Sequence, residues 1–205
     1  MTDDPRLALL GKFTPEGTLT PGYGDHYLFF VGRDDCHSIL HYLITSETLG
    51  FDFNMYGFAD PELNEDIMNL IKMPNVVVQG TLDKSQAGGV SEKKLLSLDE
   101  VQNASGFGNS IAIGESATHQ ISHTKGGVLV GQSLWFEGST NWSNAGEGAG
   151  ISLKIDTKNP TGFRAQNNTL LVSSNSIGLL RFKTQLAVEH QIAKAQQLKS
   201  QATTK

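Results

Sequence analysis

The sequence predicts an α/β protein in which helices cover both faces of a central β-sheet. Three observations support this fold class. Short segments with strand patterns alternate with longer segments in which apolar residues have helical spacing. The run Val76, Val77 and Val78 is continuously apolar, as in a strand that is covered on both faces. A helix start signal, Asp60 followed by Pro61, separates two of the predicted strands. This alternation is typical of a sheet between two helical layers.

The first half of the chain contains the clearest elements. Residues 26–31 are predicted to form a strand, and residues 36–48 have apolar side chains at helical spacing, with Gly50 as a helix stop. Residues 51–56 alternate in polarity like a strand. Asp60 then caps a second helix. The buried stripe of that helix is predicted to contain Leu63, Ile67, Leu70 and Ile71.

The second half continues the alternation. The predicted elements are, in order, a helix over 92–101, a strand over 110–113, a hairpin of strands over 128–130 and 134–136, a strand over 169–172 and a helix over 177–198. Residues 144–164 are interpreted as an insertion before the last strand, where they would shape substrate access. The candidate anchors of the last helix are Leu180, Leu186, Val188 and Ile192.

The composition predicts a single domain. The chain has 205 residues, of which 38% are hydrophobic, and this length is enough to bury one well-formed core. No linker rich in proline and serine divides the sequence. We expect an N-terminal extension over 1–25, one domain over 26–198 and a frayed tail over 199–205.

The composition also limits the classes of function. No apolar run approaches the ~20 residues of a membrane span, and no signal peptide is recognisable, so a cytoplasmic protein without stable membrane association is expected. The net charge of −5 argues against a wholly basic nucleic-acid-binding surface, although a local basic patch remains compatible with it. The lysines that would contribute to such a patch are Lys72, Lys84, Lys93, Lys94 and Lys125.

No metal or cofactor is expected from the spacing of ligand residues. The single cysteine, Cys36, excludes an intrachain disulfide and a cysteine-based metal cage. His119 and His123 precede an apolar strand, and their spacing on an extended chain is too long for one ion. His37 and His41 are one helical turn apart, but no third ligand is evident nearby in the sequence, which favours a surface pair.

Two short motifs contain side chains suited to phosphate chemistry. His123 is able to attack phosphorus and form a phosphohistidine. Lys125, two residues further along an extended segment, points to the same face about 7 Å away. The predicted hairpin brings Ser139 and Asn141 back beside His123, where Lys125 and Asn141 would stabilise developing charge. The pattern indicates phosphodiester chemistry that needs no metal.

The order H-x-K, apolar strand, turn, apolar strand and G-S-x-N resembles the phospholipase D superfamily. The resemblance covers most of residues 26–190, with one copy of the motif. It implies a phospholipase D-like α/β/α sandwich with a mixed central sheet. It also implies that His123 is the nucleophile or the general acid, that Lys125 and Asn141 bind the phosphate, and that Ser139 is a supporting hydroxyl.

The chain departs from the family pattern at two places. Five residues after the lysine, the pattern has an aspartate where this chain has Val130. That aspartate is usually read as supporting the site rather than contacting phosphorus, so the nucleophile is retained. The pattern also places a glutamate on a later strand, where it would orient the histidine. The corresponding residues 165–170 contain no glutamate, so Asn167 or Gln166 is predicted to accept the imidazole N–H, with Glu147 as the alternative.

The single motif also predicts an assembly and a function. The family builds its site from two motifs, so this chain is expected to form a C2 homodimer in which both copies of His123 face one phosphate. The leading hypothesis is a metal-independent phosphodiesterase, an endonuclease that cleaves DNA or RNA through a phosphohistidine. The alternatives are a phospholipase D-type lipid phosphodiesterase and, because Val130 replaces the aspartate, a non-catalytic phosphate-binding dimer. The sequence leaves the substrate and its strandedness open.

Overall fold

A mixed β-sheet forms the middle layer of the protein. The computed structural model describes residues 2–85, 88–104, 109–115, 123–148 and 168–203. In these residues seven strands form one sheet in the order β1-β7-β6-β5-β2-β3-β4. The strands are β1 (His26–Phe30), β2 (Gly50–Met55), β3 (Val77–Asp83), β4 (Ser110–Gly114), β5 (Lys125–Leu129), β6 (Leu134–Gly138) and β7 (Thr169–Ser173). Strands β2, β3 and β4 pair in parallel, and the other neighbours pair antiparallel.

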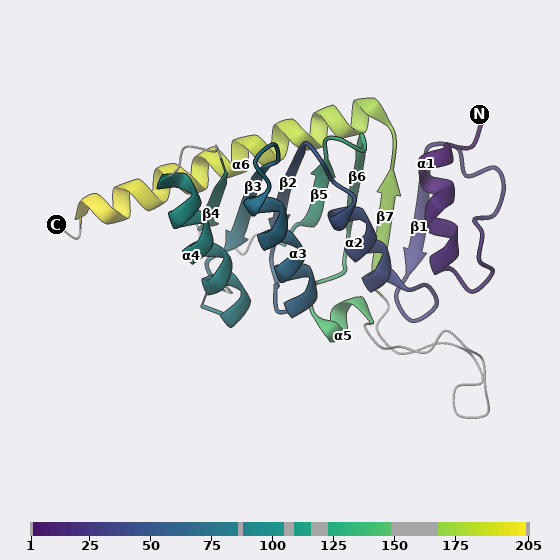
Figure 1. The fold of residues 1–205 in the computed structure, drawn as a ribbon, viewed down its shortest axis with the longest axis horizontal. Coiled ribbons are helices and arrows are strands. Elements are labelled where there is room, and N and C mark those ends of the chain that lie inside the picture. The colour runs from purple at the N-terminus through teal and green to yellow at the C-terminus, as the bar shows by residue number, and fades with distance from the viewer. Residues whose placement is uncertain (1, 86–87, 105–108, 116–122, 149–167, 204–205) are drawn as a thin grey trace.

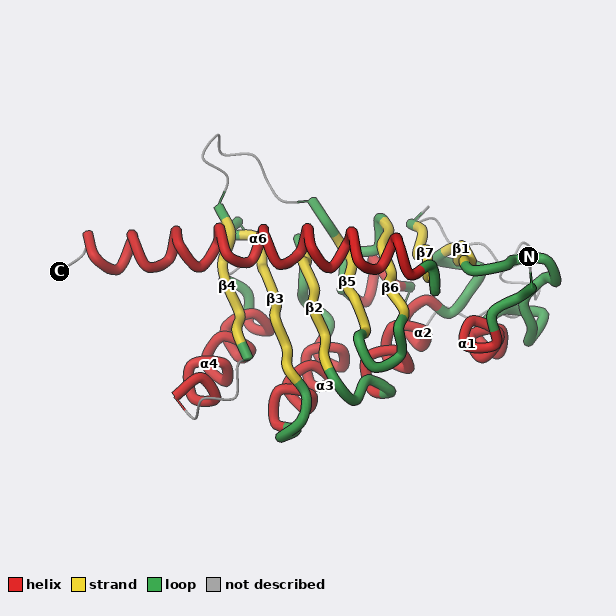
Figure 2. Tube along the Cα trace, turned by 90° about the horizontal axis from the view of Figure 1, so that it is seen from above, coloured by secondary structure: helices red, strands yellow, loops and turns green. Residues whose placement is uncertain are grey.

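Helices cover both faces of this sheet, as Figures 1 and 2 show. The helices are α1 (Pro5–Ala8), the 3₁₀ helix η1 (Leu9–Phe13), α2 (Cys36–Thr45), α3 (Pro61–Lys72), α4 (Val90–Ala104), α5 (Asn144–Glu147) and α6 (Ser176–Thr203). Helix α6 crosses one face of the sheet, and α2, α3 and α4 lie on the other (Figure 2). The predicted α/β/α sandwich with a mixed central sheet is therefore confirmed.

The start of α3 and the N-terminal segment illustrate how local sequence sets the fold. The Asp60 side chain accepts hydrogen bonds from the backbone N–H groups of Glu62 and Leu63, both at 2.8 Å, so it caps α3 as predicted. Within residues 1–25, α1 and η1 carry Leu7 and Leu10, which are fully buried in the core. This N-terminal segment is therefore packed against the domain.

An aromatic cluster in the core anchors the second motif. Trp142, next to Asn141, is completely buried. Its ring centroid lies 6.2 Å from that of Phe51, 5.6 Å from that of Phe53 and 6.0 Å from that of Phe136. Burial of a side chain this large contributes several kcal/mol to stability, as large-to-small substitutions in cores show (~3–5 kcal/mol). The segment that carries Asn141 is thus fixed to the rigid part of the protein.

The buried face of α6 differs from the predicted one. Leu186 is buried, and the residues one and two turns further on that face the sheet are His190 and Ala193. His190 Nδ1 lies 3.1 Å from the Gly80 carbonyl oxygen, so this face is partly polar. The other predicted anchors are exposed, namely Leu180, Val188 and Ile192. The prediction failed because it followed hydrophobicity, whereas small and polar side chains let this helix lie close to the sheet. Among the described helices, none combines the length and apolar composition that a membrane span requires.

Candidate functional site

The predicted nucleophile, His123, immediately precedes β5 and has an exposed side chain. Strand pairing sets its position, because Met55 of β2 is opposite Lys125 of β5, and the Tyr56 N–H donates to the Thr124 carbonyl oxygen at 3.1 Å. The ring centroids of Tyr56 and His123 are 5.0 Å apart. The imidazole therefore rests against an aromatic ring at the end of β2 while remaining accessible from solvent.

Lys125 places a cation beside this histidine. The residue is only 2% exposed, and its ammonium donates to the His123 carbonyl oxygen at 2.8 Å and lies 5.2 Å from the Tyr56 ring centroid. Burial lowers the pKa of Lys125 from its ordinary value. Among the described residues, no carboxylate forms an ion pair with this ammonium, although many such pairs occur elsewhere. The contacts of this ammonium are therefore with neutral groups, and the site is suited to an anionic ligand.

The second motif lies in the segment that follows β6. The Ser139 hydroxyl accepts a hydrogen bond from the Thr169 N–H at 3.0 Å, so it ties this segment to the start of β7. The Asn141 Oδ1 atom is buried and has no hydrogen-bond partner in the described structure. Gly57 packs so closely on this amide that a Cβ at Gly57 would lie 3.3 Å from Asn141 Oδ1. The Trp142 N–H donates to the Gly57 carbonyl oxygen at 2.9 Å, which fixes the contact.

The two motifs meet at the end of β2. Tyr56 contacts His123 and Lys125, and the next residue, Gly57, contacts Asn141. Tyr56 and Asn141 also line a pocket of about 720 Å³. The structure thus places three of the four predicted catalytic residues, His123, Lys125 and Asn141, around Tyr56 and Gly57. Ser139 supports the segment that holds Asn141.

The pocket also contains a buried acid that the sequence did not indicate. Glu92 of α4 lines it, is almost fully buried and has an Oε2 atom without a hydrogen-bond partner in the described structure. Burial raises the pKa of Glu92. A Cβ at Gly89 would lie 2.1 Å from this oxygen, so a larger residue there would displace the carboxyl group. Neither Tyr56 nor Glu92 belongs to a motif, and only the fold reveals their position.

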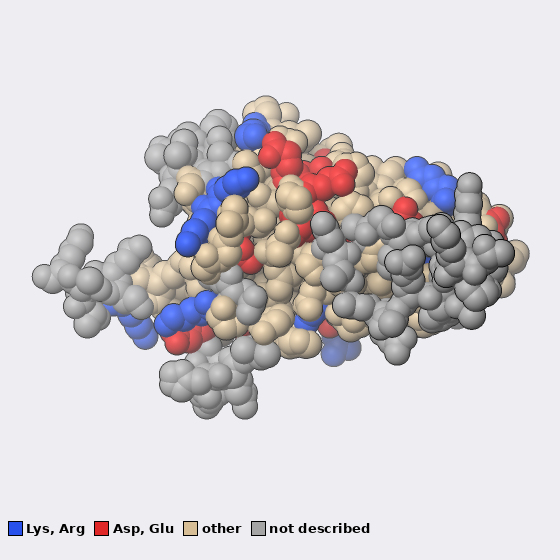
Figure 3. All heavy atoms as spheres, turned by 90° about the horizontal axis from the view of Figure 1, so that it is seen from below, with Lys and Arg blue, Asp and Glu red and all other residues tan. Residues whose placement is uncertain are grey.

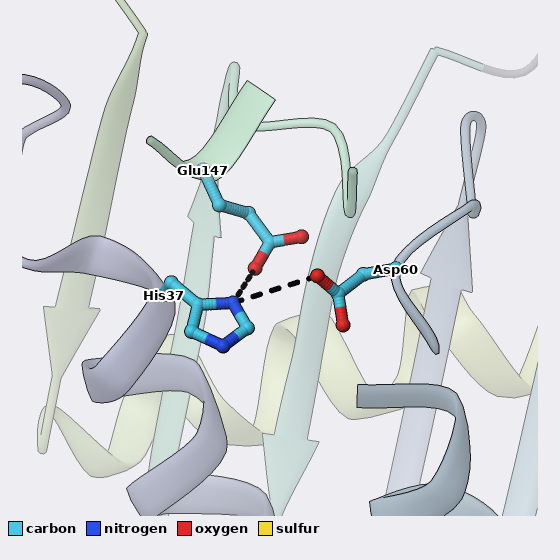
Figure 4. Close-up of side chains that lie close together, drawn as sticks. All are labelled: His37, Asp60 and Glu147. Carbon is cyan, nitrogen blue, oxygen red and sulfur yellow. Dashed lines mark hydrogen bonds and ion pairs between the residues drawn. The ribbon is translucent and has the colours of Figure 1, made fainter. Parts of the chain in front are cut away.

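Glu147 contacts a different histidine from the one expected. Its Oε2 atom lies 2.7 Å from His37 Nδ1, and its Oε1 atom has no hydrogen-bond partner, so Glu147 does not orient the His123 ring in this structure (Figure 4). The hydrogen bond to Glu147 raises the pKa of His37 to about 9. Burial raises the pKa of Glu147 to about 7, against the opposing effect of His37. Asn167, the other predicted orienting residue, lies outside the described residues, as does most of the 144–164 insertion.

Val130, which replaces the aspartate of the motif, follows β5 at the end away from Lys125. Its N–H donates to the Gly50 carbonyl oxygen at 2.9 Å. A carboxylate is nevertheless present at this turn, because Glu47 Oε1 accepts hydrogen bonds from the N–H groups of Gly131 at 2.8 Å and Gly50 at 3.0 Å. Glu47 therefore supports the hairpin that carries both motifs, and it comes from a different part of the sequence.

The charge distribution around the site is uneven. Figure 3 shows a group of acidic side chains on the face seen from below, with basic side chains at its edge and elsewhere on this face. Glu62 and Asp66 of α3 pair with His37 and His41 at 2.8 Å and 2.7 Å, so the two predicted surface histidines lie among carboxylates.

Comparison with known proteins gives matches in structure only. No protein-family model matches the sequence, and no curated protein matches it. A phospholipase D family member, Nuc from Salmonella typhimurium, superimposes with a TM-score of 0.56 at 13% identity, over 80% of this chain and 94% of that chain. NucT from Helicobacter pylori superimposes with a TM-score of 0.59 at 16% identity, over the same shares of the two chains. The chain therefore has the phospholipase D fold, as the motif pattern predicts.

Proposed function

We propose that this protein is a metal-independent phosphodiesterase that cleaves DNA or RNA through a phosphohistidine on His123. The observation that carries the proposal is that a buried ammonium, Lys125, lies beside the residue with the exposed imidazole, His123. Lys125 has no carboxylate partner among the described residues, and it is bonded to the backbone of the histidine itself. A phosphate placed against His123 would be the nearest available counterion for Lys125. The likeness to Nuc and NucT supports the same reading.

The proposed reaction has two displacements at phosphorus. A nitrogen of His123 attacks the phosphate, the bond from phosphorus to the leaving oxygen breaks, and a second histidine protonates that oxygen. Water, which gives a proton to the second histidine, then attacks the phosphohistidine, and the bond from phosphorus to nitrogen breaks. Lys125 and the Asn141 amide stabilise the charge that develops on the phosphoryl oxygens in both steps.

A homodimer would supply the second histidine. The described chain has one copy of the motif, so His123 of a second copy is the natural general acid, across an isologous interface. We therefore expect a mass in solution twice the 22.2 kDa of one chain, measured by sedimentation equilibrium. A chain that stays monomeric at the concentration where it is active would contradict the dimeric site.

The polar groups in the pocket favour nucleic acid over lipid as the substrate. The wall of the pocket includes Ser85, Ser91 and the buried carboxyl group of Glu92. An acyl chain bound there would bury these polar groups against hydrocarbon, which costs free energy. Phosphate and sugar contacts carry no sequence information, so an enzyme of this kind would cleave many sequences.

The test is a cleavage assay in excess EDTA on single- and double-stranded DNA and RNA, with phosphatidylcholine vesicles in parallel. We expect cleavage of at least one nucleic acid, and a loss of about 10²–10³ in kcat for Lys125→Gln, as when one donor to a developing oxyanion is removed. Lys12→Gln is the matched control, because Lys12 is an exposed lysine on η1, outside the predicted basic patch. Circular dichroism establishes that each variant is folded.

The possible outcomes separate the three hypotheses. Cleavage of lipid alone would support the phospholipase alternative. Binding of phosphate or nucleic acid without any turnover would support the non-catalytic module in which Val130 replaces the aspartate. Activity that is lost in EDTA and restored by Mg²⁺, an ion of phosphoryl-transfer sites, would overturn the metal-independent mechanism.

A further inference from the structure

A buried cluster of three ligand groups lies beside the second motif. His37 from the first turn of α2, Asp60 at the cap of α3 and Glu147 at the end of α5 come from distant parts of the sequence. One ligand atom from each lies within 4.8 Å of the others. His37 Nδ1 is 2.7 Å from Glu147 Oε2 and 3.6 Å from Asp60 Oδ2 (Figure 4). The three groups converge on one point between these elements.

The cluster contains more carboxyl groups than its single histidine can pair with. Asp60 and Glu147 are each 1% exposed, and among the described residues both pair only with His37. A third carboxylate, Glu62, shares the same imidazole through Nε2 at 2.8 Å. Buried carboxylates are normally paired or bound to a cation, because leaving them uncompensated in the interior is costly. A cationic ligand would complete the balance.

One oxygen in the cluster points independently to a ligand. Glu147 Oε1 is buried and has no hydrogen-bond partner in the described structure. Figure 4 shows this oxygen on the side of the Asp60 carboxylate, whose Oδ2 faces His37. A buried polar atom without a partner costs about 1–3 kcal/mol and calls for an explanation. The Asp60 Oδ1 atom is already used to cap α3, so Oδ2 is the atom available to a ligand.

We propose that His37, Asp60 and Glu147 bind one divalent cation of the zinc class. The hydrogen bond from His37 Nε2 to Glu62 leaves Nδ1 to face the two carboxylates, which is the carboxylate–histidine–metal arrangement of many metal sites. One imidazole nitrogen with two carboxylate oxygens favours Zn²⁺ over Mg²⁺ or Ca²⁺, which prefer oxygen ligands throughout. Metal–ligand bonds of ~2.0–2.2 Å require ligand atoms about 3.4 Å apart, so Nδ1 and Oε2 would separate slightly as the Nδ1 proton is released.

The cation would hold the segment that carries Asn141. The Ala59 and Asp60 N–H groups both donate to the Trp142 carbonyl oxygen, at 2.7 Å and 3.0 Å. Glu147 lies a few residues further along that segment, on α5. A metal bound to Asp60 and Glu147 would therefore strengthen the link between these two segments, which both line the pocket, as a positioning device and not as a reactant. The site stands whether or not the protein is a nuclease.

The test measures Zn²⁺ binding to chelator-treated, full-length protein by equilibrium dialysis and thermal unfolding. We expect one Zn²⁺ per chain at saturation, and a rise in Tm of about 5 °C when free Zn²⁺ exceeds Kd about a hundredfold. Glu147→Gln keeps the shape of the side chain and should weaken binding by more than about 100-fold, since even an outer-shell substitution costs 10–100-fold. Asp60→Asn retains the helix cap and should weaken binding in the same way.

The matched control is His41→Gln. His41 lies one turn further along α2 and also pairs with a carboxylate, Asp66, at 2.7 Å, but it is not part of the cluster. Its substitution should leave Zn²⁺ affinity and the metal-dependent rise in Tm unchanged. Absence of saturable Zn²⁺ binding would overturn the proposal. So would an affinity that is unchanged in Glu147→Gln and Asp60→Asn, because the metal would then bind elsewhere.

Discussion

Substitution of His123 by alanine is expected to abolish phosphodiester cleavage, with a loss of at least about 10⁴-fold in kcat. The effect should exceed that of any other single substitution, because both displacements require this imidazole. In one copy it is the nucleophile, and in the second copy it is the general acid and base. The fold should be unaffected, because the His123 side chain is exposed and packs beside the ring of Tyr56 at the surface. The measurement is the rate of cleavage in EDTA at saturating substrate.

His26→Ala serves as the control for this substitution. His26 is also exposed, and it lies on the edge strand β1, where its Nδ1 pairs with Asp25 at 2.9 Å. Its substitution should leave kcat unchanged. Substrate labelled at the phosphate should leave an alkali-stable, acid-labile label on the wild-type chain and none on His123→Ala. Residual cleavage by His123→Ala at more than about a hundredth of the wild-type rate would exclude a phosphohistidine on this residue.

Glu47→Gln is expected to lower the free energy of unfolding by about 2–3 kcal/mol, or the Tm by roughly 5–10 °C. Glu47 is almost fully buried, and its Oε1 atom accepts four backbone N–H groups, at 2.8 to 3.0 Å. The four donors are Thr48, Leu49, Gly50 and Gly131. A neutral amide accepts more weakly and places an NH₂ group beside these donors. Urea unfolding measures the loss.

The pH dependence and a surface control make this prediction specific. Burial raises the pKa of Glu47, but the four backbone hydrogen bonds outweigh it, so the folded pKa lies below the ordinary value of 4.5. The stabilisation is therefore present above about pH 4.5 and lost as the pH falls through the folded pKa. The difference in stability between wild type and Glu47→Gln should shrink in that range. Glu65→Gln, at an exposed position on α3, should change stability by less than about 0.5 kcal/mol. Equal effects of the two substitutions would contradict this role of Glu47.

The sequence predicts the order of the elements well because their signals are local. The strand that begins at His26, the cap at Asp60 and the hairpin around Gly131 each depend on a few adjacent residues, and the structure has all three. The buried face of α6 was predicted wrongly, since packing against Gly80 and Ser110 selects a histidine at position 190 over the apolar residues nearby. Contacts between the helix and the sheet therefore determine which face of α6 is buried, and helical spacing does not show them.

The candidate site was predictable only where a motif describes it. His123, Lys125 and Asn141 are named by the family pattern, and the fold brings them around Tyr56 and Gly57. Other groups carry no such signal. Glu47 lies more than eighty residues before the turn that it supports. His37 and Glu147 are 110 positions apart, so a search for a third ligand near His37 in the sequence could not find the cluster.

The pairing of β1 with β7 has a consequence for how the chain folds during translation. Strand β1 is made early, but its partner in the described part of the sheet, β7, begins at Thr169. Helix α6, which covers the face formed by β2 to β6, follows later still. A nascent chain that has left the ribosome as far as β6 therefore carries an unpaired first strand and a sheet with one face still uncovered. Such a species is prone to aggregate, so the protein reaches its fold only after residues 169–203 have emerged, by closing contacts across most of its length.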